Sequence, residues 1–184
     1  MSEKNKSFKE FILPIIVLVA ICLVISTAMA AINLITAPKI AEAQKQKEEA
    51  ALSIVVPNNQ GFTKQEITDM PESVVALYKD NGSSSVAVML SIKGYDSSNP
   101  MSVAVGFDAD GKIIKCSVIS CSGETKGIGS KVSDESFLSR FNGLNEVSSV
   151  DTISGATISS SAFKNAMADA CRVVEQYRQT EVAK

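Results

Sequence analysis

An uncharged apolar segment near the N-terminus constrains the fold of this chain more than any other feature. No Asp, Glu, Lys or Arg occurs from Phe11 to Pro38, and this length exceeds the ~20 apolar residues with which an α-helix crosses a bilayer. The sequence therefore predicts a single transmembrane helix, which we place at residues 11–35.

The short segment before this helix, residues 1–10, predicts its orientation. Lys4, Lys6 and Lys9 stand there against two glutamates, and Lys residues beside a first span favour the cytoplasmic side. We therefore expect a cytoplasmic N-terminus and a single-pass protein of the cell membrane whose main domain is extracytoplasmic.

Two alternatives to a permanent anchor remain open. Residues 28–30, Ala-Met-Ala, have the form of a signal-peptidase site, and Cys22 could be the lipidated cysteine of a lipoprotein. The apolar run continues beyond both positions and is longer than the ~7–15 residues of a signal-peptide core. An uncleaved, unlipidated anchor is therefore the favoured interpretation.

The composition after the span changes to residues that favour an α-helix. The sequence KIAEAQKQKEEAALSIVV is rich in Ala, Glu, Lys and Gln, which have high helix propensity. We expect a connecting segment over residues 36–56, with a helix from about Lys39 to Val55 that ends before Pro57.

Residues 57–184 carry the signals of one domain with an antiparallel sheet. Val86, Val88 and Leu90 alternate with other residues and should share one face of a strand. Residues 101–120 read as two further strands joined at Asp110-Gly111, a pair typical of hairpin turns.

Helical signals follow the strands, so the fold class is α+β, with one N-terminal transmembrane helix and a sheet packed by helices. Residues 133–141 predict a short helix capped by Ser133 or Asp134. A C-terminal helix should begin near Ser159 or Ser160. Its apolar face is formed by Phe163, Met167, Ala170, Val174 and Tyr177.

Charge and cysteine content exclude several classes of function. The net charge is -2 and no cluster of Lys and Arg occurs, so a nucleic-acid partner is not expected. Without any C-x-x-C pair, we also expect no metal site built by this chain alone. The thiols outside the span are expected to be free and buried: Cys116, Cys121 and Cys171.

The decapeptide DTISGATISS, residues 151–160, places hydroxyl groups around two small residues just before the C-terminal helix. The N-terminus of a helix attracts phosphate through its unpaired N–H groups. Gly155 and Ala156 would let a large ligand approach the backbone, and the Thr157 hydroxyl could accept a phosphate ester. The alternative interpretation is an ordinary Ser/Thr-rich helix cap.

This decapeptide is similar to the S-G-A-T-x-[ST] flavin-attachment motif of FMN-binding domains. Such domains occur in the G subunit of Rnf electron-transport complexes and in the C subunit of sodium-pumping NADH:quinone reductases. The resemblance implies an FMN-binding domain fold and FMN held covalently by a phosphodiester on Thr157. It also implies supporting roles for the loop residues Ser154, Gly155 and Ala156, and a helix-capping role for Ser159 and Ser160.

A second segment, CSGETKGIGSK at residues 121–131, fits neither a P-loop nor a G-x-G-x-x-G pattern. It resembles the E-T-P-G-L-G segment of the same family, although Lys126 replaces the proline and the usual preceding His is absent. The resemblance implies contacts to the flavin from Glu124, Thr125, Gly127 and Gly129. Lys131 could offset the phosphate charge or be a solvated surface residue, and Tyr95 could approach the ring or serve packing alone.

The resemblance implies an electron carrier rather than an independent catalyst, so no catalytic residue is expected. The chain would be one subunit of a membrane complex, an ion-translocating oxidoreductase, that couples ferredoxin/NAD electron transfer to ion movement. Its partners would be the other membrane and peripheral subunits, including a second flavinylated membrane subunit, and a flavin transferase during maturation. The alternatives are a related quinone-reductase subunit, a stand-alone flavin shuttle, or a redox-silent membrane-anchored adaptor.

Overall fold

A computed structural model of the chain describes residues 2–67 and 70–182, with side chains described from residue 12 to residue 181 within these ranges. The chain forms two compact units, Met1–Gln46 and Lys47–Lys184.

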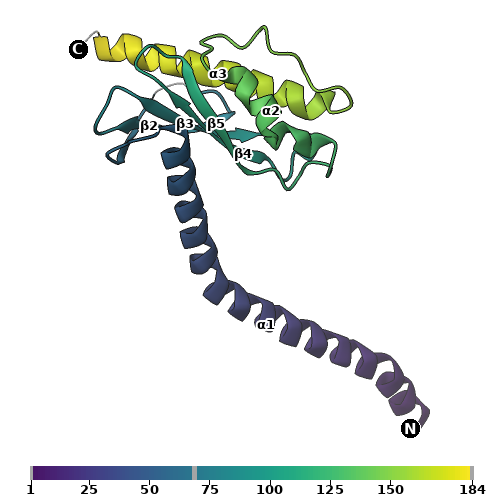
Figure 1. The fold of residues 1–184 in the computed structure, drawn as a ribbon. Helices are drawn as coiled ribbons and strands as arrows, with labels where there is room; N and C mark the ends of the chain where they lie inside the picture. The colour runs from purple at the N-terminus through teal and green to yellow at the C-terminus, as the bar shows by residue number, and fades with distance from the viewer. Residues whose placement is uncertain (1, 68–69, 183–184) are drawn as a thin grey trace. The chain divides into compact units, whose positions relative to one another are not determined.

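The first unit is helical and contains a long apolar segment. Helix α1, Ser2–Val55, begins in this unit and contains both Pro14 and Pro38 (Figure 1). Its most apolar 18-residue window has a mean hydropathy of 2.9, and none of that window is buried. A helix that is apolar all round without protein neighbours is suited to lipid, so α1 supplies one candidate membrane span.

The structure differs from the expectation of a new helix near Lys39, because α1 continues through Pro38 without a break. A proline inside a helix removes one backbone hydrogen bond, and the helix-forming residues on both sides maintain the helix here. The expected end of the helix is confirmed, since α1 stops at Val55, two residues before Pro57.

The second unit contains an antiparallel five-stranded sheet in the sequential order β1-β2-β3-β4-β5, which confirms the α+β class. The strands are β1 Phe62–Gln65, β2 Val74–Asp80, β3 Val86–Ile92, β4 Met101–Phe107 and β5 Ile113–Ser120. The predicted hairpin joins β4 to β5. Its turn has Gly111 at a φ of 80°, and the Asp108 carboxylate accepts hydrogen bonds from the N–H groups of Asp110 and Lys112.

Helices cover one face of this sheet, as Figure 1 shows for α2 and α3. Helix α3 spans Thr157–Val182, and α2, Glu135–Leu138, lies between the 3-10 turns η1, Gly129–Ser133, and η2, Ser139–Phe141. Val86, Val88 and Leu90 point into this core as predicted. Three aromatic rings meet there with centroids 5.3 to 5.5 Å apart: Phe137, Phe141 and Phe163.

The helix predicted over residues 133–141 is therefore present only as α2 and its flanking turns. Asp134 occupies the N-cap position of α2, but its side chain makes no capping hydrogen bond. The chain bends through η1 and η2 because Val132, Phe137 and Phe141 all face the core, a requirement that one regular helix would not meet.

The opposite face of the sheet receives the last two turns of α1. Ala51, Leu52 and Val55 pack there on Met89 and on three alanines of the sheet, Ala76, Ala87 and Ala104. At Gly106 the helix end comes so close that a Cβ would lie 2.1 Å from the Val55 carbonyl oxygen. Small residues in β2, β3 and β4 thus permit this direct contact between helix and sheet.

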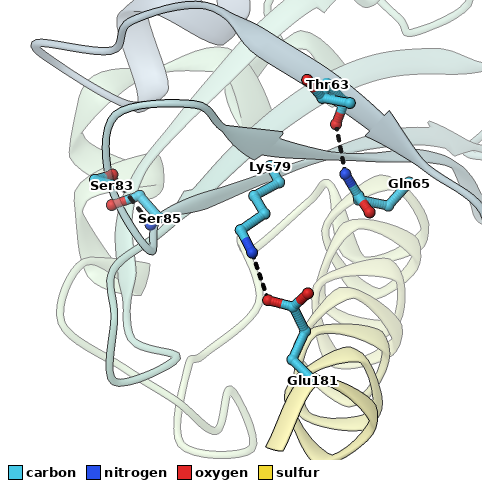
Figure 2. A network of polar contacts seen from close by, with 6 residues as sticks. All are labelled: Thr63, Gln65, Lys79, Ser83, Ser85 and Glu181. Carbon is cyan, nitrogen blue, oxygen red and sulfur yellow. Dashed lines mark hydrogen bonds and ion pairs between the residues drawn. The ribbon is translucent and has the colours of Figure 1, made fainter. Parts of the chain in front are cut away.

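An ion pair joins the C-terminal end of α3 to strand β2 (Figure 2). Lys79 on β2 extends its Nζ to within 2.5 Å of Glu181 Oε2. Nearby, the Gln65 amide donates a hydrogen bond to the Thr63 carbonyl oxygen at 3.2 Å. This pair attaches the C-terminal end of α3 to the sheet.

Candidate functional site

A cavity of about 520 Å³ lies at the N-terminal end of α3. This volume is within the range of about 300–1,000 Å³ that is usual for small-molecule sites. Three segments that are distant in sequence form it: the loop after β3, the loop after β5 and the start of α3. The lining residues are Tyr95, Thr125, Ile128, Gly129, Gly155, Ala156, Thr157, Ile158 and Ser159.

Thr157 is the first residue of α3, and its side chain is exposed at the cavity. Gly155 precedes it with a φ of 81°, and a Cβ built there would meet no atom within 4 Å. Within the described residues, no hydrogen bond engages the backbone N–H groups of Thr157, Ile158 or Ser159. These N–H groups and the positive end of the helix dipole favour an anion beside the Thr157 hydroxyl.

The predicted helix start near Ser159 or Ser160 is wrong by two or three residues, and neither serine is the N-cap. The left-handed Gly155 turns the chain sharply, and the Ala156 N–H bonds to the Ile153 carbonyl oxygen at 3.0 Å. The helix can therefore begin directly at Thr157.

Both serines have other bonding roles in the first turn of α3. Ser160 Oγ accepts a hydrogen bond from the Ile153 N–H at 3.1 Å and donates one to the Ala156 carbonyl oxygen at 2.8 Å. Ser159 Oγ donates to a carboxylate oxygen of Glu124. These hydroxyls therefore fix the loop and the helix start instead of capping the helix.

The structure places Glu124 behind the cavity lining. The residue is 6% exposed, and its Oε1 accepts a hydrogen bond from the Tyr95 N–H at 3.0 Å. Its Oε2 accepts the bond from the Ser159 hydroxyl. Glu124 thus connects three segments of the site without being among the residues that line the cavity.

The other predicted site residues divide into two groups. Thr125 and Gly129 line the cavity together with Gly155, Ala156 and Thr157. The second group lies outside the lining. There the Gly127 N–H donates to Ser130 Oγ at 2.9 Å, and the side chains of Lys131 and Ser154 are exposed.

Apolar side chains at the cavity mouth were not identified from the sequence, apart from Tyr95. Tyr95, Ile128 and Ile158 are 67%, 50% and 61% exposed, and all three line the cavity; we call them the apolar rim. Among residues 56–67 and 70–181, the other exposed large apolar residue is Val75. The available signal was an isoleucine in each of two polar segments, which is weak because single exposed apolar residues are common.

The residues present fit FMN. A phosphate can lie at the start of α3, Gly155 leaves the wall beside it free of a side chain, and the apolar rim can contact a planar ring. Among the described residues, no group of three His, Cys, Asp or Glu side chains is arranged to hold a metal ion. The donor set of the cavity is thus suited to a phosphate with an aromatic group.

The cysteines lie outside this cavity lining and are free thiols: Cys22, Cys116, Cys121 and Cys171. Cys116 on β5 is buried, whereas Cys121 and Cys171 are half-buried. Burial, with smaller effects of Cys171 and Glu135, raises the pKa of Cys116 to about 12. This thiol is therefore a neutral core group at physiological pH.

Comparisons with known proteins agree with this geometry. The family model of the FMN-binding domain matches residues 94–172, a range that contains every residue lining the cavity. Over 167 residues the chain is 26% identical to the G subunit of the proton-translocating ferredoxin:NAD(+) oxidoreductase complex of Clostridium ljungdahlii. The alignment covers 85% of this chain and 87% of that relative. Residues 94–172 are therefore similar to the FMN-binding domain family, and most of the chain is similar to a G subunit of such a ferredoxin:NAD(+) oxidoreductase complex.

Proposed function

We propose that this chain is an electron-carrier subunit of a membrane-bound Rnf-type complex and that it carries FMN through a phosphodiester on Thr157. The observation that carries the proposal is the position of the Thr157 hydroxyl. It is exposed at the first turn of α3, beside backbone N–H groups without partners in the described structure and at the edge of a 520 Å³ cavity.

Each part of the cavity has a defined role in this proposal. The N–H groups of Thr157, Ile158 and Ser159 hold the phosphate oxygens, since a helix N-terminus favours an anion. Gly155 leaves room for the ribityl chain, and the apolar rim contacts the ring system. FMN supplies one- and two-electron transfer when bound, while the residues of this chain attach it, orient it and limit its contact with water.

Attachment requires the Thr157 oxygen to form a bond to the FMN phosphorus. A flavin transferase would move the FMN moiety from FAD to the hydroxyl, with AMP as the leaving group and the hydroxyl proton released. The exposed position of Thr157 leaves the oxygen accessible to such an enzyme. A covalent bond prevents loss of the flavin outside the cell.

The proposal also assigns a place in the membrane. The apolar segment of α1 anchors the chain, with the N-terminus in the cytoplasm and the FMN-binding domain on the outer side. The relative's complex is named for ferredoxin and NAD. We assign this chain to an equivalent ion-translocating complex, where it exchanges electrons with membrane subunits, one of them a second flavinylated subunit, and contacts neither soluble substrate.

The test is a comparison of Thr157→Ala with Thr152→Ala, both expressed in cells that contain the transferase. Both threonines are exposed in the same decapeptide, so the second variant controls for general effects on this loop. Alanine is a favourable residue at a helix start, and Thr157→Ala should therefore fold. Intact mass and flavin fluorescence of the denatured protein report covalent FMN.

We expect a mass gain equal to FMN less one water in the wild type and in Thr152→Ala, and none in Thr157→Ala. Covalent flavin retained in Thr157→Ala would refute the attachment site. A folded wild type without flavin, from cells with an active transferase, would refute the electron-carrier proposal and favour a redox-silent adaptor.

A further inference from the structure

Glu124 is a buried carboxylate whose partners come from two distant parts of the chain. Tyr95, which donates to Oε1, is 29 residues away, and Ser159, which donates to Oε2, is 35 residues away. Because an ionised carboxylate only accepts hydrogen bonds, each oxygen binds one donor and the side chain bridges two separate loops.

The surrounding backbone leaves space for this carboxylate and for little else. A Cβ at Gly94 would lie 1.9 Å from Oε1, and a Cβ at Gly129 would lie 2.5 Å from Oε2 and 2.8 Å from Ser159 Oγ. Glycine at these two positions therefore forms the cage in which the Glu124 carboxylate lies.

The partners of Glu124 are all close to the ligand cavity. Tyr95 belongs to the apolar rim, Gly129 lines the cavity, and Ser159 lies in the first turn of α3, two residues after Thr157. Glu124 is itself absent from the lining, so its contribution is to hold those segments in place.

We infer that Glu124 is a positioning residue whose hydrogen bonds hold the three segments of the FMN site in fixed positions. The inference rests on the proposed function, because it concerns the seat of a flavin attached at Thr157. Without these hydrogen bonds, the phosphodiester still tethers the flavin at the start of α3, but Tyr95 and the loop around Gly129 move independently of that helix. The flavin ring then loses its fixed contact with the apolar rim.

The experiment compares Glu124→Ala with Asp80→Ala in the full chain in detergent. Asp80 is also a buried carboxylate, 3% exposed. It accepts hydrogen bonds from the N–H groups of Gln60 and Gly82 and from the Ser83 hydroxyl. It precedes β3, whereas Tyr95 follows β3, so the Asp80 variant reproduces the loss of a buried carboxylate at the other end of that strand.

Two measurements separate positioning from general destabilisation. The first is hydrogen exchange of the Tyr95 amide, which needs no flavin; we expect at least a ~10-fold increase in Glu124→Ala, as for a lost hydrogen bond to a charged group. The second is the fluorescence anisotropy of covalent flavin, which should fall in Glu124→Ala. Neither quantity should change in Asp80→Ala.

Glu124→Gln is the conservative variant and also the substitute if the alanine variant does not fold. Its amide oxygen can accept from the Tyr95 N–H, and its NH2 group can donate to the Ser159 hydroxyl. It should therefore restore slow exchange and high anisotropy. Ser159→Ala removes one bond only and should lower the anisotropy while the Tyr95 amide stays protected.

Unchanged Tyr95 exchange in Glu124→Ala, or an equal increase in Asp80→Ala, would overturn the inference. If only Glu124→Gln and Ser159→Ala fold, wild-type anisotropy in Ser159→Ala would overturn it in the same way. A wild type without covalent flavin would instead overturn the proposed function, and the Tyr95 exchange would still decide whether Glu124 joins the loops.

Discussion

The cage around Glu124 makes Gly94→Ala an informative substitution. A Cβ at this position would lie 1.9 Å from Glu124 Oε1, 2.9 Å from Glu124 Cδ and 3.1 Å from Met101 Cε. Gly94 is not one of the glycines with positive φ, so alanine is compatible with the backbone. The cost of the substitution must therefore come from the contact with Glu124.

The magnitude follows from what the new methyl group displaces. Oε1 has to move, which breaks its hydrogen bond from the Tyr95 N–H; a hydrogen bond to a charged group contributes about 1.5–3 kcal/mol to stability. In a Glu124→Ala background both nearest atoms are gone, and the remaining neighbour is the flexible end of Met101. We therefore expect the two substitutions to be coupled by about 1.5–3 kcal/mol, with Gly94→Ala much less costly in the second background.

The assay is a double-mutant cycle on the free energy of unfolding in urea. The full chain in detergent is followed by the fluorescence of its three tyrosines. Gly106→Ala provides the control, because its Cβ would clash with the Val55 carbonyl oxygen at a similar distance of 2.1 Å and near the other end of β4. Its cost should add to that of Glu124→Ala within about 0.5 kcal/mol. If the unfolding costs of Gly94→Ala and Glu124→Ala also add within about 0.5 kcal/mol in the double variant, the reasoning is refuted.

Two further predictions concern the core. Gly106→Ala alone should lower the free energy of unfolding by about 1–3 kcal/mol, the usual cost of overpacking, because the end of α1 must move off β4; an unchanged urea midpoint would contradict this close contact. The second concerns pH: the Cys116 pKa is raised from 9.0 to about 12 in the fold, so the thiol stays protonated there while it ionises in the unfolded chain. The stability that the buried neutral thiol contributes to the fold is fully present below pH 9. It is lost between pH 9 and pH 12, by up to about 1.4 kcal/mol per pH unit. Measured from pH 7 to pH 11, the stability of Cys116→Ala should fall less steeply above pH 9 than that of the wild type, and parallel curves would exclude this linkage.

Several features of the fold could be predicted from the sequence because they depend on neighbouring residues. The apolar run within α1, the alternation of Val86, Val88 and Leu90, and the Asp110-Gly111 turn each express a local rule of length, period or turn geometry. Strands β1 and β2 were not predicted, because they lack such a local pattern. β1 has only four residues, and in β2 the apolar residues follow one another without alternation.

The candidate site also has one part that local sequence indicates and another that depends on the tertiary structure. The sequence by itself was enough to propose Thr157 as the attachment point of a flavin, because this threonine and its small neighbours form one continuous motif. Only the tertiary structure decided what surrounds that threonine: the start of α3 at Thr157, the apolar rim, and the position of Glu124 behind the cavity. The physical reason is that a hydrogen bond between residues 29 or 35 positions apart leaves no periodic pattern in a sequence, since it forms only after the sheet and α3 have brought the loops together.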